Sequence, residues 1–243
     1  MFGLGSWLRR RGPVITLTQH KFGNASPVPD EEMIGLLSAV KAALPQKRSC
    51  AVGIISTLPG EGTTTIAQSL ASVAARNPRT KVITCRVTHE SQDGEQPGTP
   101  FIYLEPVLHP SQEYARSSQH AQLPAHARGD AGQYPLVHSG GRGQGGPMMG
   151  QLTAASDLTY IVKSLTGSFD LVVVDLPPVS VGPLGPSLAK GLDGVVVVVE
   201  AERTRVPAVR ATRKSIEMYG GTILGFVLNK RQFHIPHALY KRL

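Results

Sequence analysis

The chain has 243 residues, 41% of them hydrophobic and 17% charged, which fits one α/β domain, alone or with tails. Its formal net charge of +8 is compatible with nucleic acid, an acidic membrane surface or an acidic partner, and equally with a solubilising surface. Cys50 and Cys85 show no metal-ligand spacing, so we interpret them as reduced core residues of a cytosolic protein. Apolar runs stay below the roughly 18 residues that a membrane span needs.

Residues 1–28 have the composition of a flexible basic arm. The stretch FGLGSWLRRR places its basic cluster after its apolar residues, which is the wrong order for a secretory signal. The same mixture of aromatic, aliphatic and basic side chains could contact anionic lipid. We therefore predict a basic arm over 1–28, followed by a single domain over 29–243.

Helix-like and strand-like segments alternate over the next part of the chain. Residues 30–44 carry apolar side chains at helical spacing behind an acidic first turn. Residues 50–56 are strand-like, Thr63 to about Arg76 is an Ala-rich helix, and 80–86 is the next strand. A strand, a helix and a strand in close succession form a βαβ unit, which predicts a parallel sheet.

Residues 89–150 differ sharply from the rest in composition. The segment is rich in Gln, Gly, Pro and Ser and holds five of the eight histidines at irregular spacing, with no cysteine partner. We interpret it as a mobile low-complexity insert rather than a metal site. Residues 101–108 and 134–139 are candidate short strands inside it.

Regular structure is predicted again from residue 151. The predicted elements are a helix over 151–167, a strand within 169–179, a strand over 194–200, a helix over about 206–219 and a strand over 222–230. Continuous β-branched runs separated by helices indicate an all-parallel sheet covered by helices on both faces. The fold class is therefore α/β.

The stretch PGEGTTT has the form of a phosphate-binding loop between a strand and a helix. Its glycines allow backbone N–H groups to converge on phosphate, and the helix N-terminus adds a partial positive charge. Thr64 stands where a hydroxyl would bind Mg²⁺. The candidate phosphate-binding residues of this loop are Gly60, Glu61, Gly62, Thr63, Thr64 and Thr65.

Two further polar residues end buried strands. Asp175 closes the strand within 169–179, where a carboxylate could hold Mg²⁺ or act in catalysis, and Asn229 ends the last strand, where an amide could read a base. Ligands of open α/β sheets bind at the carboxyl ends of the strands. We therefore expect both side chains near the loop.

Five segments together resemble the cytoplasmic P-loop domain of bacterial tyrosine kinases, the autokinases tied to polysaccharide copolymerases in capsule and exopolysaccharide export. They are STLPGEGTTTIAQSLA, TKVITCR, SFDLVVVDLPPV, DGVVVVVEAERTR and ILGFVLNK. The resemblance covers about 30–88 and 150–230. It implies a P-loop NTPase fold of the deviant Walker type, with ATP as a candidate cofactor and Mg²⁺ as a candidate whose binding is weakened in this chain.

At the site, this chain departs from the pattern of that family. Thr63 replaces the loop lysine, and Arg86 and Thr88 stand where the family has an Asp-x-Asp pair. Phosphoryl transfer depends on metal, lysine and positioning, so kinase activity should fall by several orders of magnitude. Arg86 could reach the phosphates in place of the lysine; the alternative is that it faces solvent.

The oligomerisation and tail motifs of the family are also altered. The Glu-x-x-Arg-x-x-Arg pattern reads Glu32, Gly35 and Ser38 here, so both arginines are gone. In place of a terminal tyrosine cluster the chain has Tyr240, the first candidate for phosphorylation.

The resemblance predicts a pseudokinase-like regulatory partner in exopolysaccharide biosynthesis and export. We expect it in the cytoplasm, peripheral to the inner membrane, beside a copolymerase on a separate chain, and we do not expect nucleic acid as a partner. Two alternatives stay open: an active ATP-dependent tyrosine autokinase of the same pathway, and a positioning or partition ATPase that binds membrane or DNA.

Overall fold

The computed structural model describes residues 14–18, 30–44, 47–89, 100–107, 136–138, 148–151 and 155–231. Its strands are β1 (Val14–Thr18), β2 (Cys50–Ser56), β3 (Val82–His89), β4 (Pro100–Val107), β5 (Leu136–His138), β6 (Met148–Gln151), β7 (Leu171–Asp175), β8 (Gly194–Glu200) and β9 (Ile223–Arg231). Its helices are α2 (Asp30–Ala43), α3 (Thr63–Ala75), α5 (Ala155–Thr166), α6 (Leu184–Ala189) and α7 (Val206–Met218), with a short 3₁₀ helix η2 (Val179–Val181).

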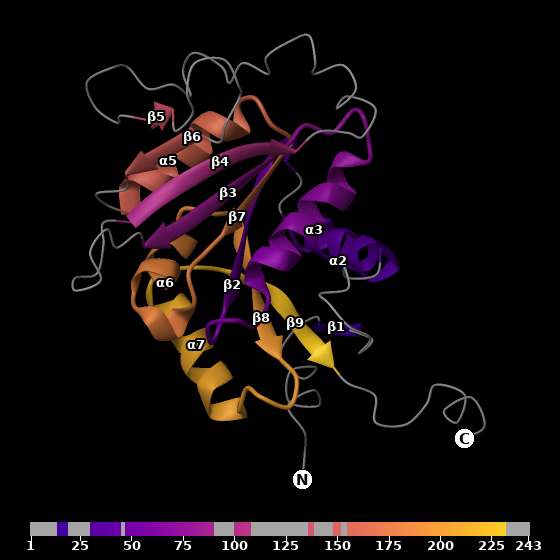
Figure 1. Ribbon diagram of the computed structural model, residues 1–243, viewed down its shortest axis with the longest axis vertical. Helices are drawn as coiled ribbons and strands as arrows, with labels where there is room; N and C mark the ends of the chain where they lie inside the picture. Colours follow the sequence, from indigo (N-terminus) through magenta and orange to yellow (C-terminus); the bar gives the residue numbers. More distant parts are fainter. Residues whose placement is uncertain are drawn as a thin grey trace.

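These strands form one sheet in the order β1-β9-β8-β2-β7-β3-β4-β6-β5 (Figure 1). From β1 to β3 all neighbours are parallel, which confirms the α/β prediction. The strands β4, β6 and β5 extend the sheet in antiparallel pairing, so the expectation of an all-parallel sheet is wrong at this end. Strands β4 and β5 lie within 89–150, whereas β6 runs from Met148 to Gln151, and the helix predicted over 151–167 is shortened to Ala155–Thr166.

Helices cover both faces of the sheet and produce two hydrophobic cores. In Figure 1, α2 and α3 lie on one face, and α5, α6 and α7 lie on the other. The first core packs Met33, Leu36 and Leu70 against sheet residues that include Val173. The second core joins residues of α5, α6 and α7 to the opposite side of the same strands. Burial on both faces explains why β7 and β8 are rich in valine.

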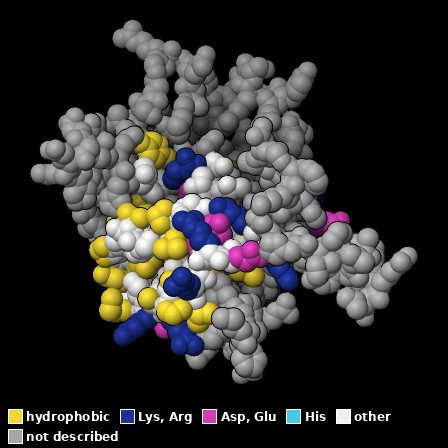
Figure 2. Space-filling model, turned by 60° about the horizontal axis from the view of Figure 1, so that its bottom comes forward, with side chains coloured by type: hydrophobic (Ala, Val, Ile, Leu, Met, Phe, Trp, Pro, Cys, Tyr) yellow, Lys and Arg dark blue, Asp and Glu magenta, His cyan; other side chains and the backbone are white. Residues whose placement is uncertain are grey.

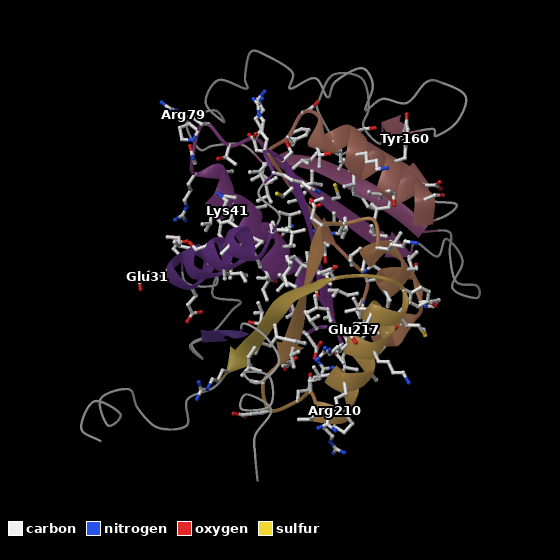
Figure 3. The ribbon with its side chains drawn as sticks, turned by 180° about the vertical axis from the view of Figure 1, so that it is seen from behind. Glu31, Lys41, Arg79, Tyr160, Arg210 and Glu217 are labelled. Atoms are coloured by element: carbon white, nitrogen blue, oxygen red, sulfur yellow. The ribbon has the colours of Figure 1, made fainter. Side chains whose placement is uncertain are left out.

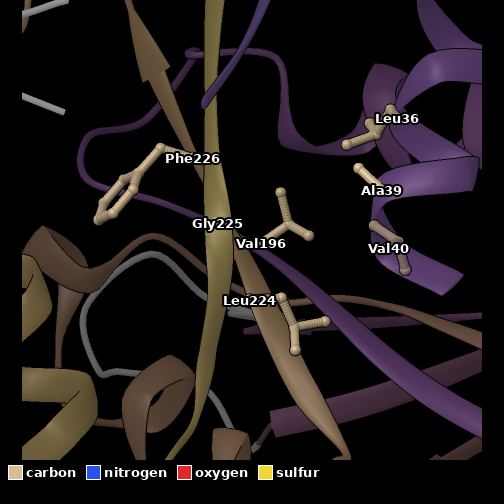
Figure 4. A pocket seen from close by; sticks show the side chains of 7 residues that line it. All are labelled: Leu36, Ala39, Val40, Val196, Leu224, Gly225 and Phe226. Atoms are coloured by element: carbon tan, nitrogen blue, oxygen red, sulfur yellow. The ribbon is translucent and has the colours of Figure 1, made fainter. Parts of the chain in front are cut away.

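Helix α2 packs closely on β8 and β9. A narrow apolar groove remains between them (Figure 4), lined by Leu36, Ala39, Val40, Val196, Leu224, Gly225 and Phe226. Its volume of about 20 Å³ is close to the space of one water molecule. The helix therefore sits against the sheet with little wasted volume.

Strand β1 corrects the interpretation of residues 1–28 as a flexible arm throughout. Val14 pairs in parallel with Phe226, and Ile15 with Val227, on the free side of β9. The other residues of the arm, most of 89–150 and Tyr240 lie outside the described residues. Among the described helices, none combines the length and the apolar character that crossing a membrane requires.

Candidate phosphate-binding site

The loop 56–65 joins the end of β2 to the start of α3 at the carboxyl edge of the parallel strands. Gly60 and Gly62 have φ of +80° and +98°, a left-handed conformation that glycine adopts without strain. Gly62 is the N-cap of α3, and no side chain caps the helix there. The first N–H groups of α3 therefore point outward without a capping acceptor, which is the arrangement that binds an anion.

Glu61 holds the loop together from the inside. Its side chain is completely buried, and one carboxylate oxygen accepts the N–H groups of Thr57 and Leu58 at 2.7 and 2.8 Å. The other oxygen accepts the N–H of Glu200 at 3.2 Å and the hydroxyl of Thr204. Because the carboxylate is turned into the protein, any contact of Glu61 with phosphate would come from its backbone N–H.

Asn229 supports the loop from β9. Its side-chain amide donates to the carbonyl of Glu61 at 2.8 Å, and the residue has no exposed surface. Its Oδ1 atom is buried without a hydrogen-bond partner among the described residues. In this geometry the Asn229 side chain lies behind the loop and supports its backbone, and base reading by Asn229 stays a prediction.

Two cations hold the outer side of the loop. Lys230 donates to the carbonyl of Gly60 at 2.6 Å, and Arg203 donates to that of Pro59 at 3.2 Å. Both also pair with Glu200, at 3.2 and 2.9 Å. Burial acts to raise the pKa of Glu200, but the two hydrogen-bonded cations outweigh it, so the pKa lies below its ordinary value.

The contacts of Lys230 and Arg203 with the loop, which we call the outer clamp, were not predicted from the sequence. The signal that could have revealed it is the placement of charged residues directly at or after the ends of two buried strands, 194–200 and 223–231. Figure 2 brings this end of the molecule forward and shows Lys and Arg side chains beside acidic ones near the middle of the face.

One carboxylate oxygen of Asp175 contacts two residues that were predicted to bind metal or phosphate. The hydroxyl of Thr64 donates to its Oδ2 at 2.6 Å, and Nε of Arg86 lies 3.5 Å from the same atom. Arg86 and Asp175 are register partners on β3 and β7. Burial raises the pKa of Asp175 above its ordinary value, and the Thr64 hydrogen bond and the Arg86 charge oppose this only in part.

Beside this cluster lies a small hollow of about 120 Å³. It is lined by Ala67, Gln68, Thr84, Cys85, Arg86, Tyr103 and Asp175. Thr63, at the position of the family's loop lysine, is buried, and Thr65 is exposed. Arg86 keeps 47% of its side chain exposed while it pairs with Asp175, so it neither faces solvent alone nor lies buried.

A glycine-rich loop between a parallel strand and a helix, with an aspartate at the end of the adjacent strand, defines a P-loop type of α/β domain. The fold is similar to that of the chimerical protein CapA2B2, with a TM-score of 0.56, 20% identity, and coverage of 95% of this chain and 98% of that chain. It is also similar to the kinase domain of the Escherichia coli tyrosine kinase ETK, with a TM-score of 0.53, 17% identity, and coverage of 97% and 91%.

Sequence similarity is confined to a shorter segment. The chain is 30% identical over 84 residues to CapB of Staphylococcus aureus and 29% identical over 70 residues to the tyrosine-protein kinase CpsD of Streptococcus agalactiae. These matches span 35% and 29% of this chain and 37% and 31% of the relatives, about a third of their length. No family model matches the chain. In fold and in this segment, the chain resembles the P-loop domain of bacterial tyrosine kinases.

Proposed function

We propose that this chain is a degenerate tyrosine-kinase-like P-loop protein that regulates capsule or exopolysaccharide biosynthesis and export, with weak or no phosphoryl transfer of its own. The fold and the similarity to CapB and CpsD support the pathway. The observation that supports weak or no phosphoryl transfer is the ion pair of Arg86 with Asp175.

The Asp175 cluster does not suit a magnesium ion. Magnesium requires near-octahedral oxygen ligands, commonly one or two carboxylates with waters and phosphate. Here the hydroxyl of Thr64 donates a hydrogen bond to Oδ2 of Asp175, and the guanidinium of Arg86 lies against the same oxygen. The positive charge of Arg86 opposes the entry of a second cation.

The loop itself keeps the shape that binds phosphate. Gly60 and Gly62 hold their left-handed conformations, and Glu61 and Asn229 fix the loop from behind. In the proposal, the N–H groups from Gly60 to Thr65 bind the phosphates of ATP, and Arg86 supplies the charge that lysine and Mg²⁺ provide in an active kinase. Nucleotide binding then depends little on Mg²⁺.

The proposed partner is an inner-membrane polysaccharide copolymerase, with this chain held at the membrane surface beside it. The resemblance to kinases that are tied to such copolymerases supports this partner. The site supports a regulatory role: a domain that binds ATP without turnover changes its contacts with a partner when ATP binds one conformation more tightly than the other.

Calorimetric titration of the full chain with ATP and ADP, with and without Mg²⁺, tests the proposal. We expect binding that Mg²⁺ does not strengthen and that Arg86→Gln weakens about tenfold, the usual effect of losing one charge-assisted contact. Arg76→Gln is the matched control, because Arg76 pairs with Asp30 at the opposite end of α3. Tight binding only with Mg²⁺, together with phosphotyrosine on the purified protein, would instead establish the active autokinase.

A further inference from the structure

A second hollow lies at the amino edge of the sheet, at the opposite end of α3 from the loop 56–65. We call it the amino-edge pocket. It has a volume of about 390 Å³ and lies between the ends of α2 and α3 and the starts of β2 and β7. It is lined by Lys41, Leu44, Lys47, Arg48, Cys50, Arg79, Thr80, Asp170 and Leu171. Figure 3 shows Lys41 and Arg79 on the same side of the molecule.

The lining carries more positive charge than its acidic neighbours offset. Lys47 is engaged by Asp193 at 2.6 Å, and the other oxygen of Asp193 accepts the N–H of Ala51. Asp170 accepts the backbone N–H of Lys81 at 2.8 Å. In contrast, the side chains of Lys41, Arg48 and Arg79 form no ion pair with any described residue.

The C-terminal ends of two helices neutralise part of this positive charge, but not all of it. Both α2 and α3 end at this edge, and two helix C-termini together carry about one negative charge. Asp170 and Asp193 offset two of the four cations that line the pocket. An excess of about one positive charge remains, held inside a hollow where its field is focused.

We propose that the amino-edge pocket binds a small soluble anion that carries phosphate groups. Two arginines offer planar, bidentate donors that match phosphate oxygens, and Lys41 and the hydroxyl of Thr80 add further donors. Leu44, Leu171 and Cys50 supply apolar wall for the body of the ligand. The volume falls within the range of small-molecule sites. The cations line a hollow rather than a flat face, which favours a compact ligand over a membrane surface.

Cys50 provides a local reporter of occupancy. It lines the pocket and is half-buried, whereas Cys85 is completely buried. Burial raises the pKa of the Cys50 thiol, so alkylation is slow at neutral pH and is best followed at mildly alkaline pH. A ligand in the pocket should slow this reaction, whereas a ligand in the loop 56–65 should not.

The test is a calorimetric titration of the full chain with inorganic pyrophosphate at low salt, with the rate of Cys50 alkylation measured in parallel. We expect saturable binding that slows alkylation in proportion to occupancy. Arg48→Gln and Arg79→Gln should each weaken binding about tenfold. Lys163→Gln, an exposed cation on α5, and Arg213→Gln, a partly exposed cation on α7 that pairs with Glu217, should leave it unchanged.

Three outcomes would overturn the proposal. One is the absence of saturable binding up to about ten millimolar pyrophosphate. Another is binding that leaves the alkylation of Cys50 unchanged, which would place pyrophosphate at the loop. The last is protection of Cys50 by vesicles of anionic phospholipid but not by pyrophosphate, which would make the pocket a membrane contact. Arg48 and Arg79 make no ion pair with the described residues, so their variants should fold normally, and thermal unfolding checks this.

Discussion

Gly62→Ala should destabilise the protein strongly, although it adds a single methyl group. A Cβ at Gly62 would lie 2.3 Å from Nδ2 of Asn229, and the φ of +98° is unfavourable for any residue with a side chain. The left-handed conformation costs about 1–2 kcal/mol. Displacing Asn229 breaks its hydrogen bond to the buried carbonyl of Glu61, which costs about 1–3 kcal/mol more. The sum, about 2–5 kcal/mol, is a large part of the stability of a typical domain.

Urea unfolding of this variant beside Gly35→Ala is the direct assay. Gly35 lies in α2, and a methyl group there would have no neighbouring atom within 4 Å, so alanine should stabilise by about 0.5–1 kcal/mol. The two glycine-to-alanine changes should therefore shift the urea midpoint in opposite directions. In an Asn229→Ala background, Gly62→Ala should cost only the conformational part, because the clash is gone. An unchanged midpoint for Gly62→Ala would refute the packing of the loop against Asn229.

Three further changes test charged groups, two at the site and one on the surface of α7. Glu61→Gln should destabilise by about 2–4 kcal/mol in urea unfolding, since an amide NH₂ would face buried donors such as the N–H of Thr57. Glu217→Gln, which removes an exposed pair with Arg213, should change stability by less than about 0.5 kcal/mol in the same assay. For Asp175→Asn the readout is stability against pH. The raised pKa means that the folded state holds the proton more tightly, so the stabilisation by Asp175 is full below about pH 4 and is lost as pH rises through the folded pKa. The unfolding free energy of the unaltered chain should thus fall relative to Asp175→Asn across that window, and parallel curves would contradict the raised pKa.

The sequence was sufficient to predict the strands that are buried on both faces of the sheet and the helix between them. The βαβ unit from β2 to β3 and the valine-rich strand β8 follow from periodicity and β-branched composition alone. Strand β1 could not be predicted with the same ease, because its partner β9 lies about 200 residues away and its neighbours in sequence are basic or turn-forming. The antiparallel strand β4 was expected as a short strand, but its direction depends on pairing that composition does not encode.

At the site, the residue types predicted which side chains lie close together better than they predicted what each side chain does. Gly60, Gly62, Thr64 and Asp175 come together as the loop pattern indicated. Asn229 lies at the same edge but supports the loop, because the direction of its side chain is set by packing under Glu61. The clamp by Lys230 and Arg203 arises only because β9, β8 and β2 are neighbours, and the strand order could not be read from the sequence.

The short strand β1 has a consequence for any shortened form of the protein. It occupies the outer side of β9, whose apolar residues Phe226, Val227 and Leu228 would otherwise present an open row of backbone donors and acceptors. Bare edges of this kind pair with other chains and lead to self-association. A chain that begins at Asp30 would retain the loop and the aspartate, yet it should be prone to aggregate. Residues 14–18 are therefore expected to protect this edge of the domain from self-association.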